Sequence, residues 1–370
     1  MSILEEKQAV PDAARQEQAP LDPAKQEAFA GEMVDVLNKS ALALLTSLGH
    51  QSGLFDTMAA LPPSTSADVA KAAGLDERYV REWLGGMVVG GFVEYEPEGE
   101  TYALPPEHAA SLTTAAGPDN LAGMMPYIGL MGEVEQQVVR CFRDGGGVPY
   151  TSYPRFQALQ AEETARVYDA ALVSTIVPLV PDLPERLRAG LDVLDVGTGQ
   201  GHAPLVLAQA FPAGRFHGLD RSEAGVEAAR AEASRLGVGN VRYTVADSTQ
   251  ISGEYDLITA FDVIHDLAQP AETLTAIAGA LRDGGTFLMC DIAASSRLEK
   301  NTEHVFGPAL YCFSVFYCMT TSLSTGGAGL GTVWGQETAV RMLKEAGFEH
   351  VDIKSVEGDP LNAYYIATKG

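Results

Sequence analysis

The sequence predicts an α/β fold, in which a mostly parallel β-sheet carries helices on both faces, and three observations support this. From Gly190 onward, short apolar runs typical of strands alternate with alanine-rich runs typical of helices. The last two apolar runs lie close enough in sequence to pair as an antiparallel hairpin at the sheet edge. The chain has 370 residues, 46% of them hydrophobic, which is enough for two or three domains.

The charge and cysteine content exclude several classes of partner. The 25 Lys and Arg residues stand against 49 Asp and Glu residues, and the formal net charge of −24 repels phosphate backbones and anionic lipid. The first twelve residues are charged where a signal peptide would be apolar, and no run approaches the roughly 18 apolar residues of a membrane helix. The four cysteines form no C-x-x-C pair. We expect a cytoplasmic protein that binds neither nucleic acid nor membrane.

The N-terminal region predicts a tail followed by a helix. Residues 1–25 are rich in Ala, Gln, Glu and Pro, a composition typical of a mobile tail. From Glu27 to about Leu48, apolar residues recur at helical spacing, and Gly49 ends the pattern. The end of this helix is apolar enough to need a partner surface.

Residues 26–115 predict a winged helix-turn-helix domain. Ser66 and Asp76 lie where helix N-caps belong, and Gly74 lies in the turn between two short helices. Two strand-like runs, Phe92–Glu96 and Thr101–Leu104, follow as a hairpin.

The charge of this domain argues against DNA binding. Between Ser64 and Leu104, three basic residues, Lys71, Arg78 and Arg81, stand against eight acidic ones, and the wing alone carries four glutamates. A helix that reads DNA needs basic residues facing phosphates. We therefore expect a domain used for packing and for forming a homodimer.

Residues 116–186 predict a helical connector that also serves as a lid. A loop rich in Gly and Pro, residues 145–154, interrupts the helical pattern and contains Tyr150 and Tyr153.

Residues 187–370 predict the α/β domain, with seven strand-like runs that indicate one sheet. The runs are Val193–Val196, Arg215–Leu219, Val241–Val245, Tyr255–Phe261, Thr286–Asp291, Val351–Val356 and Ala363–Thr368.

The strongest motif follows the first of these strands. Gly197, Gly199 and Gly201 form a turn that leads into a helix, where glycines let the backbone approach a ligand and the free N–H groups of the helix face it. The turn predicts a nucleotide-type ligand. His202 occupies the position where the dinucleotide motif G-x-G-x-x-G has its third glycine, so that motif is not matched.

Carboxylates end the next two strands. Asp220 lies about 20 residues beyond the glycine turn, where a carboxylate can accept both hydroxyls of a ribose. Asp247 ends the third strand, and an acidic residue there suits a donor on adenine.

Asp195, the glycines, Asp220 and Asp247, in this order, resemble the class I S-adenosylmethionine-dependent methyltransferases from about Asp192 to Gly370. The resemblance implies a Rossmann-like sheet with strand order 3-2-1-4-5-7-6, strand 7 antiparallel, and S-adenosyl-L-methionine as cofactor. It places the glycines beneath the methionine part, Asp220 at the ribose, and Asp247 with Ser248 at the adenine. We expect the cofactor site to comprise Asp195, Gly197, Thr198, Gly199, Gly201, Asp220, Arg221, Asp247, Ser248, Phe261, Asp262, Tyr150 and Tyr153.

The fourth strand ends in Phe261-Asp262-Val-Ile-His265-Asp266, and strand ends of this kind line the ligand crevice. The His-Asp pair resembles small-molecule O-methyltransferases that carry a dimerising winged-helix domain, in which the histidine is the general base. The resemblance implies catalytic roles for His265 and Asp266 and a hydroxyl acceptor. Two features depart from that family: Leu267 replaces an aromatic residue, and no pair of downstream glutamates is assignable. His265 as a substrate contact or helix cap, and Asp266 as an N-cap, remain alternatives.

A metal-assisted mechanism is the competing hypothesis, because Asp262 and Asp291 both lie at strand ends and could hold a hard cation. Ile292 follows Asp291, so the Asp-Asn pair of metal-dependent catechol methyltransferases is missing. We therefore predict no metal.

Residues 293–335 form an insertion rich in aromatic and sulfur-containing side chains. Such a helix is either core or the wall of an acceptor pocket. We expect the substrate pocket to include His304, Tyr311, Ser314, Tyr317 and Cys318.

The sequence thus predicts methyl transfer from S-adenosylmethionine to a small molecule, with a hydroxyl oxygen as the leading acceptor and a thiol or nitrogen as the alternative. Hypotheses from other classes are an S-adenosylmethionine-sensing regulator, a cofactor-binding protein without activity, and a nicotinamide dehydrogenase.

Overall fold

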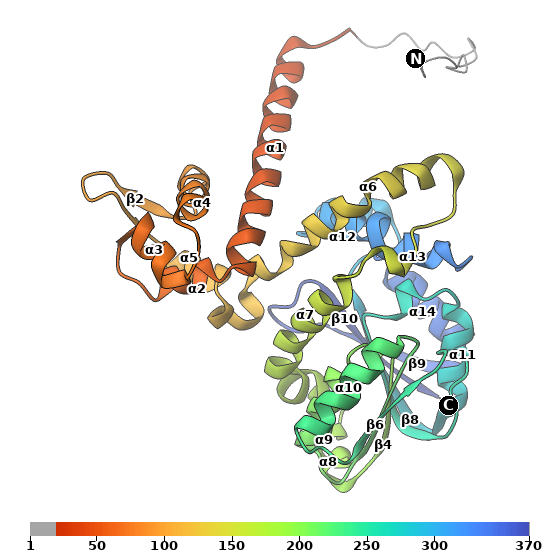
Figure 1. Ribbon diagram of the computed structural model, residues 1–370. Helices are drawn as coiled ribbons and strands as arrows, with labels where there is room; N and C mark the ends of the chain where they lie inside the picture. Colours follow the sequence, from red (N-terminus) through yellow and green to blue (C-terminus); the bar gives the residue numbers. More distant parts are fainter. Residues whose placement is uncertain (1–19, 370) are drawn as a thin grey trace.

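The computed structural model describes residues 20–369 and shows a small N-terminal domain, a run of connecting helices and a C-terminal α/β domain (Figure 1). Within the described residues, no single helix is long and apolar enough to cross a membrane. One bent pair of helices, Phe156–Leu179 with Leu183–Ala189, meets the length and composition criteria only when the two are taken together. Residues 1–19, most of the predicted tail, lie outside the described part of the chain.

The first helix, α1 (Pro23–Gln51), begins inside the segment predicted to be a tail. The Asp22 carboxylate accepts a hydrogen bond from the Ala24 N–H at 3.0 Å. Pro23 occupies the first helical turn, where no intrahelical donor is lost. These two features explain the earlier start. Figure 1 shows α1 projecting away from both domains over most of its length.

The last turns of α1 pack against the N-terminal domain. The Trp83 indole N–H donates to the Leu45 carbonyl at 2.8 Å. A Cβ atom at position 49 would lie 2.5 Å from the Trp83 ring and 2.6 Å from the Phe55 ring, so Gly49 is required where the helix meets this core.

The N-terminal domain has the predicted winged helix-turn-helix arrangement, with its short strands in the order β1-β3-β2. Gly74 makes the turn between the two helices with φ +68°. Asp76 caps the second helix as predicted, but Thr65 rather than Ser66 caps the first, because its Oγ1 accepts the Asp68 N–H. The elements are α2 (Leu54–Ala59), β1 (Ser64–Thr65), α3 (Ser66–Ala73), α4 (Glu77–Val89), β2 (Glu94–Glu96) and β3 (Thr101–Ala103).

The connecting segment is a succession of helices interrupted by the loop at residues 145–149. Its elements are α5 (Pro106–Leu112), η1 (Thr114–Asp119), η2 (Leu121–Met124), α6 (Pro126–Asp144), η3 (Tyr150–Ser152), α7 (Phe156–Ala171), η4 (Leu172–Ile176), η5 (Val177–Leu179) and α8 (Leu183–Ala189).

The C-terminal domain is built on a seven-stranded sheet with the order β6-β5-β4-β7-β8-β10-β9. This confirms the predicted order 3-2-1-4-5-7-6. The first five strands are parallel, and β10 is antiparallel to both of its neighbours, so Tyr364 lies opposite Cys290 on one side and Lys354 on the other. The strands are β4 (Asp192–Val196), β5 (Arg215–Asp220), β6 (Val241–Val245), β7 (Tyr255–Phe261), β8 (Leu281–Ile292), β9 (Phe348–Lys354) and β10 (Asn362–Lys369).

Alternate residues of the central strands face two separate hydrophobic cores. Leu194 and Ile258 pack with α11 (Pro270–Ala280) and α14 (Gln336–Glu345), whereas their neighbours Val193 and Leu257 pack with α8 and with α9 (His202–Ala210). Because both faces are covered, the central strands are almost continuously apolar, and polar side chains are concentrated where the strands end. The flanking helices are α9 (His202–Ala210), α10 (Glu223–Arg235), α11 (Pro270–Ala280) and α14 (Gln336–Glu345).

The predicted insertion, residues 293–335, forms a helical layer against α6. Its Tyr317 and Cys318 share one core with Tyr127, Val134 and Tyr153 of the connecting segment. The elements of this region are η7 (Leu298–Lys300), α12 (Gly307–Phe313), the π-helical turn η8 (Ser314–Cys318) and α13 (Met319–Ser324).

Candidate active site

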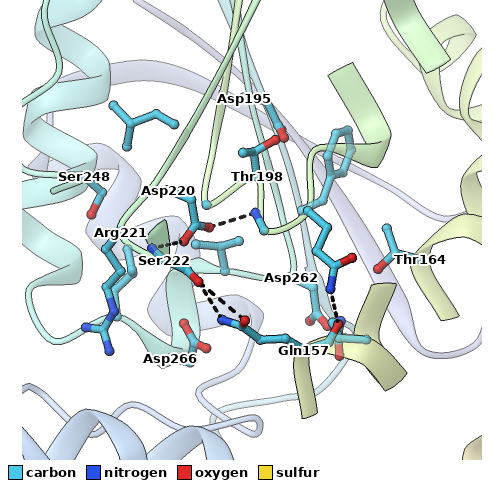
Figure 2. A pocket seen from close by; sticks show the side chains of 18 of the residues that line it. Gln157, Thr164, Asp195, Thr198, Asp220, Arg221, Ser222, Ser248, Asp262 and Asp266 are labelled. Atoms are coloured by element: carbon cyan, nitrogen blue, oxygen red, sulfur yellow. Dashed lines mark hydrogen bonds between the residues drawn. The ribbon is translucent and has the colours of Figure 1, made fainter. Parts of the chain in front are cut away.

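A cavity of about 430 Å³ lies at the carboxyl ends of the parallel strands. Its walls are the loops that follow β4, β5, β6 and β7, together with α7 and the η8 turn (Figure 2). Open α/β sheets bind their ligands at this edge. The predicted residues that line it are Tyr150, Asp195, Gly197, Thr198, Gly199, Asp220, Arg221, Asp247, Ser248, Phe261, Asp262, His265, Asp266, Tyr317 and Cys318.

The glycine turn after β4 depends on backbone conformations that other residues rarely adopt. Gly197 and Gly201 have φ of +72° and +77°. A Cβ atom at Gly197 would lie 2.5 Å from the Val263 side chain, and one at Gly201 would lie 2.4 Å from the Tyr243 ring. Gly201 does not line the cavity. It shapes the turn from below, where its carbonyl accepts the Tyr243 hydroxyl at 2.8 Å.

Asp220, at the end of β5, is held by two backbone donors. Its Oδ2 accepts the Gly199 N–H at 2.7 Å, and its Oδ1 accepts the Ser222 N–H at 2.8 Å (Figure 2). Each oxygen keeps further acceptor capacity on the cavity side. The carboxylate is therefore fixed in a geometry that can receive two hydroxyl donors.

Asp247 and Ser248 follow β6 on the same rim. Asp247 Oδ1 accepts both the backbone N–H of Thr249 at 2.8 Å and its hydroxyl at 2.6 Å. These bonds lower the pKa of Asp247, so the group stays an acceptor. The Ser248 hydroxyl lies 2.8 Å from the Thr273 hydroxyl of α11.

Asp195 lies at the floor of the cavity and is almost fully buried. The Thr259 hydroxyl donates to its Oδ1 at 2.7 Å. Burial raises the pKa of Asp195 to about 6, although the hydrogen bond from Thr259 acts in the opposite direction.

His265 lies in the short turn η6 (Ile264–Asp266) after β7 and is 3% exposed. Its Nδ1 lies 2.9 Å from Oδ1 of Asp291, which is fully buried on β8. An ionised carboxylate only accepts hydrogen bonds, so Nδ1 carries a proton, and Nε2 is the nitrogen that becomes an acceptor when the ring is neutral. The same Asp291 oxygen accepts the Trp334 indole N–H at 3.0 Å and the Ile292 N–H at 2.8 Å.

The surroundings of His265 change its basicity. Burial by itself lowers the pKa of the imidazole, but the charge of Asp291, with the neighbouring Cys318 and the bond to Asp291, raises it well above the ordinary value of 6.5. The imidazolium form is therefore favoured near neutral pH.

Asp262, His265 and Asp291 bring three possible metal ligands within 4.8 Å of one another. The hydrogen bonds of His265 and Asp291 do not fit a bound cation, however. The His265 nitrogen that faces both carboxylates carries a proton, and Oδ1 of Asp291 already accepts three donors. Burial also raises the pKa of Asp262, which favours its neutral form. These features argue against a cation at this cluster, and the absence of a metal stays a prediction.

Tyr150, in the connecting segment, lines the cavity. Its hydroxyl lies 3.3 Å from Asp266 Oδ2, and the Arg221 guanidinium lies 4.3 Å from the centre of its ring. Burial raises the pKa of Asp266 to about 6. Asp266 does not cap α11, because Gln269 occupies the cap position, so the N-cap alternative is wrong.

Several predicted residues do not line this cavity, and the roles predicted for them stay predictions. Tyr153 is buried behind Tyr317, where its hydroxyl donates to the Phe316 carbonyl. His304 bonds to the Ala293 carbonyl at 3.2 Å, and neither Tyr311 nor Ser314 is among the residues that line the cavity. A helix presents only one face to a neighbouring cavity, and here that face contributes Tyr317 and Cys318.

The sequence did not predict that α7 forms one wall of the cavity. Gln157 Nε2 donates to the Ser222 hydroxyl at 3.0 Å, and the Gln200 amide donates to the Gln157 carbonyl at 3.3 Å (Figure 2). Phe156 of the same helix stacks on Tyr317. These contacts hold α7 over the cavity, and no local motif marks such residues in the sequence. The partner of His265 was also missed, although Asp291 was noted at its strand end.

Comparisons with known proteins match both domains. Residues 40–114 match the model of the Rv2258c-like winged HTH domain, and residues 187–347 match the model of a methyltransferase domain. Nocamycin O-methyltransferase of Saccharothrix syringae is 33% identical over 105 residues, which are 27% of this chain and 38% of the relative. The chain spans 38%, 45% and 51% of the length of three curated relatives that it matches.

Two solved structures share the fold across nearly the whole chain. Human N-acetylserotonin methyltransferase, in complex with S-adenosylmethionine, has a TM-score of 0.68 at 17% identity and covers 95% of this chain and 99% of its own. An O-methyltransferase family protein from Burkholderia thailandensis has a TM-score of 0.67 at 16% identity. The match covers 92% of this chain and 98% of the Burkholderia chain. The predicted succession of two domains is confirmed.

Proposed function

The chain joins a winged helix-turn-helix domain to a methyltransferase domain of the S-adenosylmethionine-dependent kind, and from this we propose that it transfers a methyl group to a hydroxyl oxygen of a small molecule. One observation carries the proposal. The His265–Asp291 pair lies at the same cavity as the glycine turn and Asp220, so a proton acceptor and a cofactor site share one space.

The residues around the cavity fit the cofactor. Asp220 has two oxygens placed for ribose hydroxyls, and Asp247 with Ser248 lies on the adjacent rim for the adenine. The backbone of the Gly197–Gly199 turn would face the methionine part, near the Asp195 carboxyl. When bound, S-adenosylmethionine supplies an electrophilic methyl group on its sulfonium.

His265 is the general base in this proposal. Nε2 of His265 would accept the proton of the acceptor hydroxyl while that oxygen takes the methyl group, which the cofactor would supply as it leaves as the neutral thioether. The buried Asp291 carboxylate stabilises the imidazolium that results. Holding the reacting atoms in line can supply several kcal/mol of the barrier reduction, about 7 or more in well-oriented systems.

The cover over the cavity excludes water. The Gln157–Ser222 bond and the Tyr150–Asp266 contact tie the connecting segment to the rim, and Phe156 and Tyr317 close one side. Aromatic rings near a sulfonium also favour a cation.

A regulator that binds DNA is not supported by the winged-helix domain. Both arginines of α4 form ion pairs on their own helix, Arg78 with Glu82 and Arg81 with Glu77. A shift assay on mixed DNA at low salt is expected to show no complex.

An acceptor screen tests the oxygen assignment. The full chain is incubated with methyl-labelled S-adenosylmethionine and matched phenols, thiophenols and anilines, and the products are identified by mass spectrometry. We expect methylation of phenol oxygens. If only thiophenols or anilines are methylated, the acceptor is a sulfur or a nitrogen rather than an oxygen, and the cofactor assignment still holds.

The pH profile gives a further prediction. The base form of His265 appears only as the pH rises through its raised pKa, so kcat/KM is expected to keep increasing above pH 6.5. The measurement is kcat/KM for the best phenol between pH 5.5 and 9.5. A rate that is level from pH 6 upward would contradict this role.

We also propose that the chain forms a homodimer through α1. Phe29 and Leu37 on this projecting helix are 61% and 69% exposed, and Met33 and Val36 lie on the same stretch (Figure 1). Large exposed apolar faces mark interaction surfaces. The four free cysteines suit a cytoplasmic location.

Light scattering on the full chain tests the dimer. We expect a mass about twice the 39.2 kDa of one chain, and a monomer for the double variant Phe29→Glu, Leu37→Glu. A monomeric parent protein, or a variant that remains dimeric, would remove α1 as the interface.

A further inference from the structure

Trp334 lies in the segment just before α14 and is 4% exposed. Its indole N–H donates at 3.0 Å to Asp291 Oδ1, the oxygen that also accepts His265 Nδ1 at 2.9 Å. The other Asp291 oxygen is buried and has no hydrogen-bond partner. The indole and the Ile292 N–H, which donates at 2.8 Å, thus both hold the carboxylate oxygen that faces the imidazole, and the indole is the only side-chain donor of the two.

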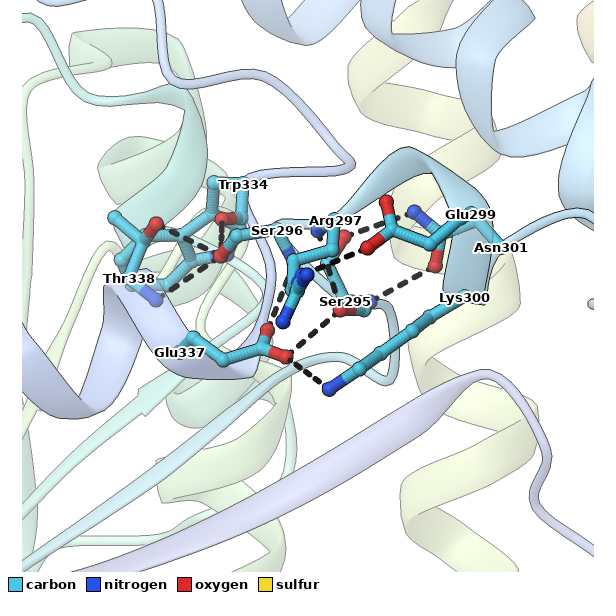
Figure 3. A network of polar contacts seen from close by, with 9 residues as sticks. All are labelled: Ser295, Ser296, Arg297, Glu299, Lys300, Asn301, Trp334, Glu337 and Thr338. Atoms are coloured by element: carbon cyan, nitrogen blue, oxygen red, sulfur yellow. Dashed lines mark hydrogen bonds and ion pairs between the residues drawn. The ribbon is translucent and has the colours of Figure 1, made fainter.

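The position of Trp334 is fixed by a polar network between two loops (Figure 3). The Ser296 hydroxyl donates to the Trp334 carbonyl at 2.7 Å. Glu337 accepts the Ser296 N–H at 2.8 Å and Lys300 Nζ at 3.0 Å. A Cβ atom at Gly335 would lie 1.9 Å from Ser296 N, so the two loops touch directly. This network makes the indole a rigid donor.

Around His265 and Asp291, Trp334 is a neutral hydrogen-bond donor, whereas the other side chains that face His265 are charged or titratable. The groups that face His265 from the surrounding elements are Asp291 on β8, Asp262 after β7, Asp266 beside it in η6, and Cys318 in η8. A donor on a carboxylate oxygen takes up part of its negative charge. The indole therefore reduces the charge that Asp291 presents to the ring.

We propose that Trp334 is a positioning residue, whose indole N–H orients the Asp291 carboxylate and sets the pH at which His265 becomes a base. The catalytic consequence rests on the proposed function, in which His265 is the base. The positioning itself is a property of the folded chain and needs neither cofactor nor acceptor.

The first measurement uses the unmodified protein. The chain has two tryptophans, so a ¹⁵N-labelled sample gives two indole N–H signals, which Trp83→Phe assigns. The His265 ring signal is assigned by its loss in His265→Ala. We expect the Trp334 indole signal to shift with the same midpoint pH as His265, and the Trp83 signal, bonded to the Leu45 carbonyl, to stay constant.

The second measurement compares two identical substitutions. Trp334→Phe removes the donor from Asp291 and is expected to raise the midpoint of His265 by about one pH unit, since a neighbouring charge commonly shifts a pKa by 1 to 3. Trp83→Phe also removes one buried indole bond, but in the other domain, and is expected to leave the His265 midpoint unchanged. In an Asp291→Asn background, Trp334→Phe should no longer move the midpoint.

A Trp334 signal that stays constant while His265 titrates would overturn the proposal. An unchanged or lower midpoint in Trp334→Phe would overturn it as well. Failure of the proposed function has a different signature. If the indole and His265 titrate together but the acid limb of kcat/KM in Trp334→Phe does not follow the His265 midpoint, the positioning stands and His265 is not the base.

Discussion

Replacing His265 by alanine is expected to lower kcat for methyl transfer to a phenol by about 10²- to 10⁴-fold, the usual contribution of general-base catalysis. The reason is that no other described group combines a free ring nitrogen with a buried carboxylate partner at the cavity. Affinity for S-adenosylhomocysteine should change by no more than about threefold, because the residues proposed for the ribose and the adenine, Asp220, Asp247 and Ser248, lie on other loops. Steady-state kinetics and calorimetry on the same samples separate the two quantities.

His304→Ala is the matched control for this prediction. The substitution is the same, but the His304 ring bonds to the Ala293 carbonyl away from the cavity, so kcat should stay near that of the parent protein. If His265→Ala retains full turnover, His265 is a contact residue and the base must be sought elsewhere. Equal losses in both variants would point to destabilisation, which unfolding measurements can detect.

Replacing Asp220 by alanine is expected to weaken S-adenosylhomocysteine binding by about 10²-fold, or about 2.7 kcal/mol. Two charge-assisted bonds to ribose hydroxyls are lost, and the Gly199 and Ser222 N–H groups that hold the carboxylate are left without their acceptor. Isothermal calorimetry measures the change directly. Asp220→Asn keeps one acceptor oxygen and should lose less, about tenfold.

Asp352→Ala, on the exposed edge strand β9, provides the control for charge. It also removes one carboxylate from this acidic chain, but it lies outside the cavity and pairs with Lys354, so affinity should be unchanged. An Asp220→Ala variant that binds as tightly as the parent would show that the ribose is held by other residues.

The parts of the fold that the sequence predicts are those marked by a pattern of neighbouring residues, such as an apolar run or a glycine turn. Strands buried on both faces are continuous apolar runs, and their carboxyl ends lie at one edge, which brings Asp195, Asp220 and Asp247 to one cavity from positions far apart in the chain. The glycine turn is visible because few residues other than glycine adopt its backbone angles.

The features that the sequence does not predict are side-chain direction and long-range contacts. Tyr153, His304, Tyr311 and Ser314 lie in the predicted segments but face other neighbours, because spacing along a chain does not say which face of a helix meets the cavity. The bond between Asp291 and Trp334 joins residues 43 positions apart, across an insertion, and no local pattern marks it.

Calorimetry with S-adenosylhomocysteine and NAD, on separate samples of the full chain, tests the central claim most directly. Both ligands carry an adenosine that an α/β crevice can bind, so the comparison separates a methyltransferase from a dehydrogenase. We predict one S-adenosylhomocysteine bound per chain and no heat of binding for NAD. Binding of NAD without binding of S-adenosylhomocysteine would contradict the account.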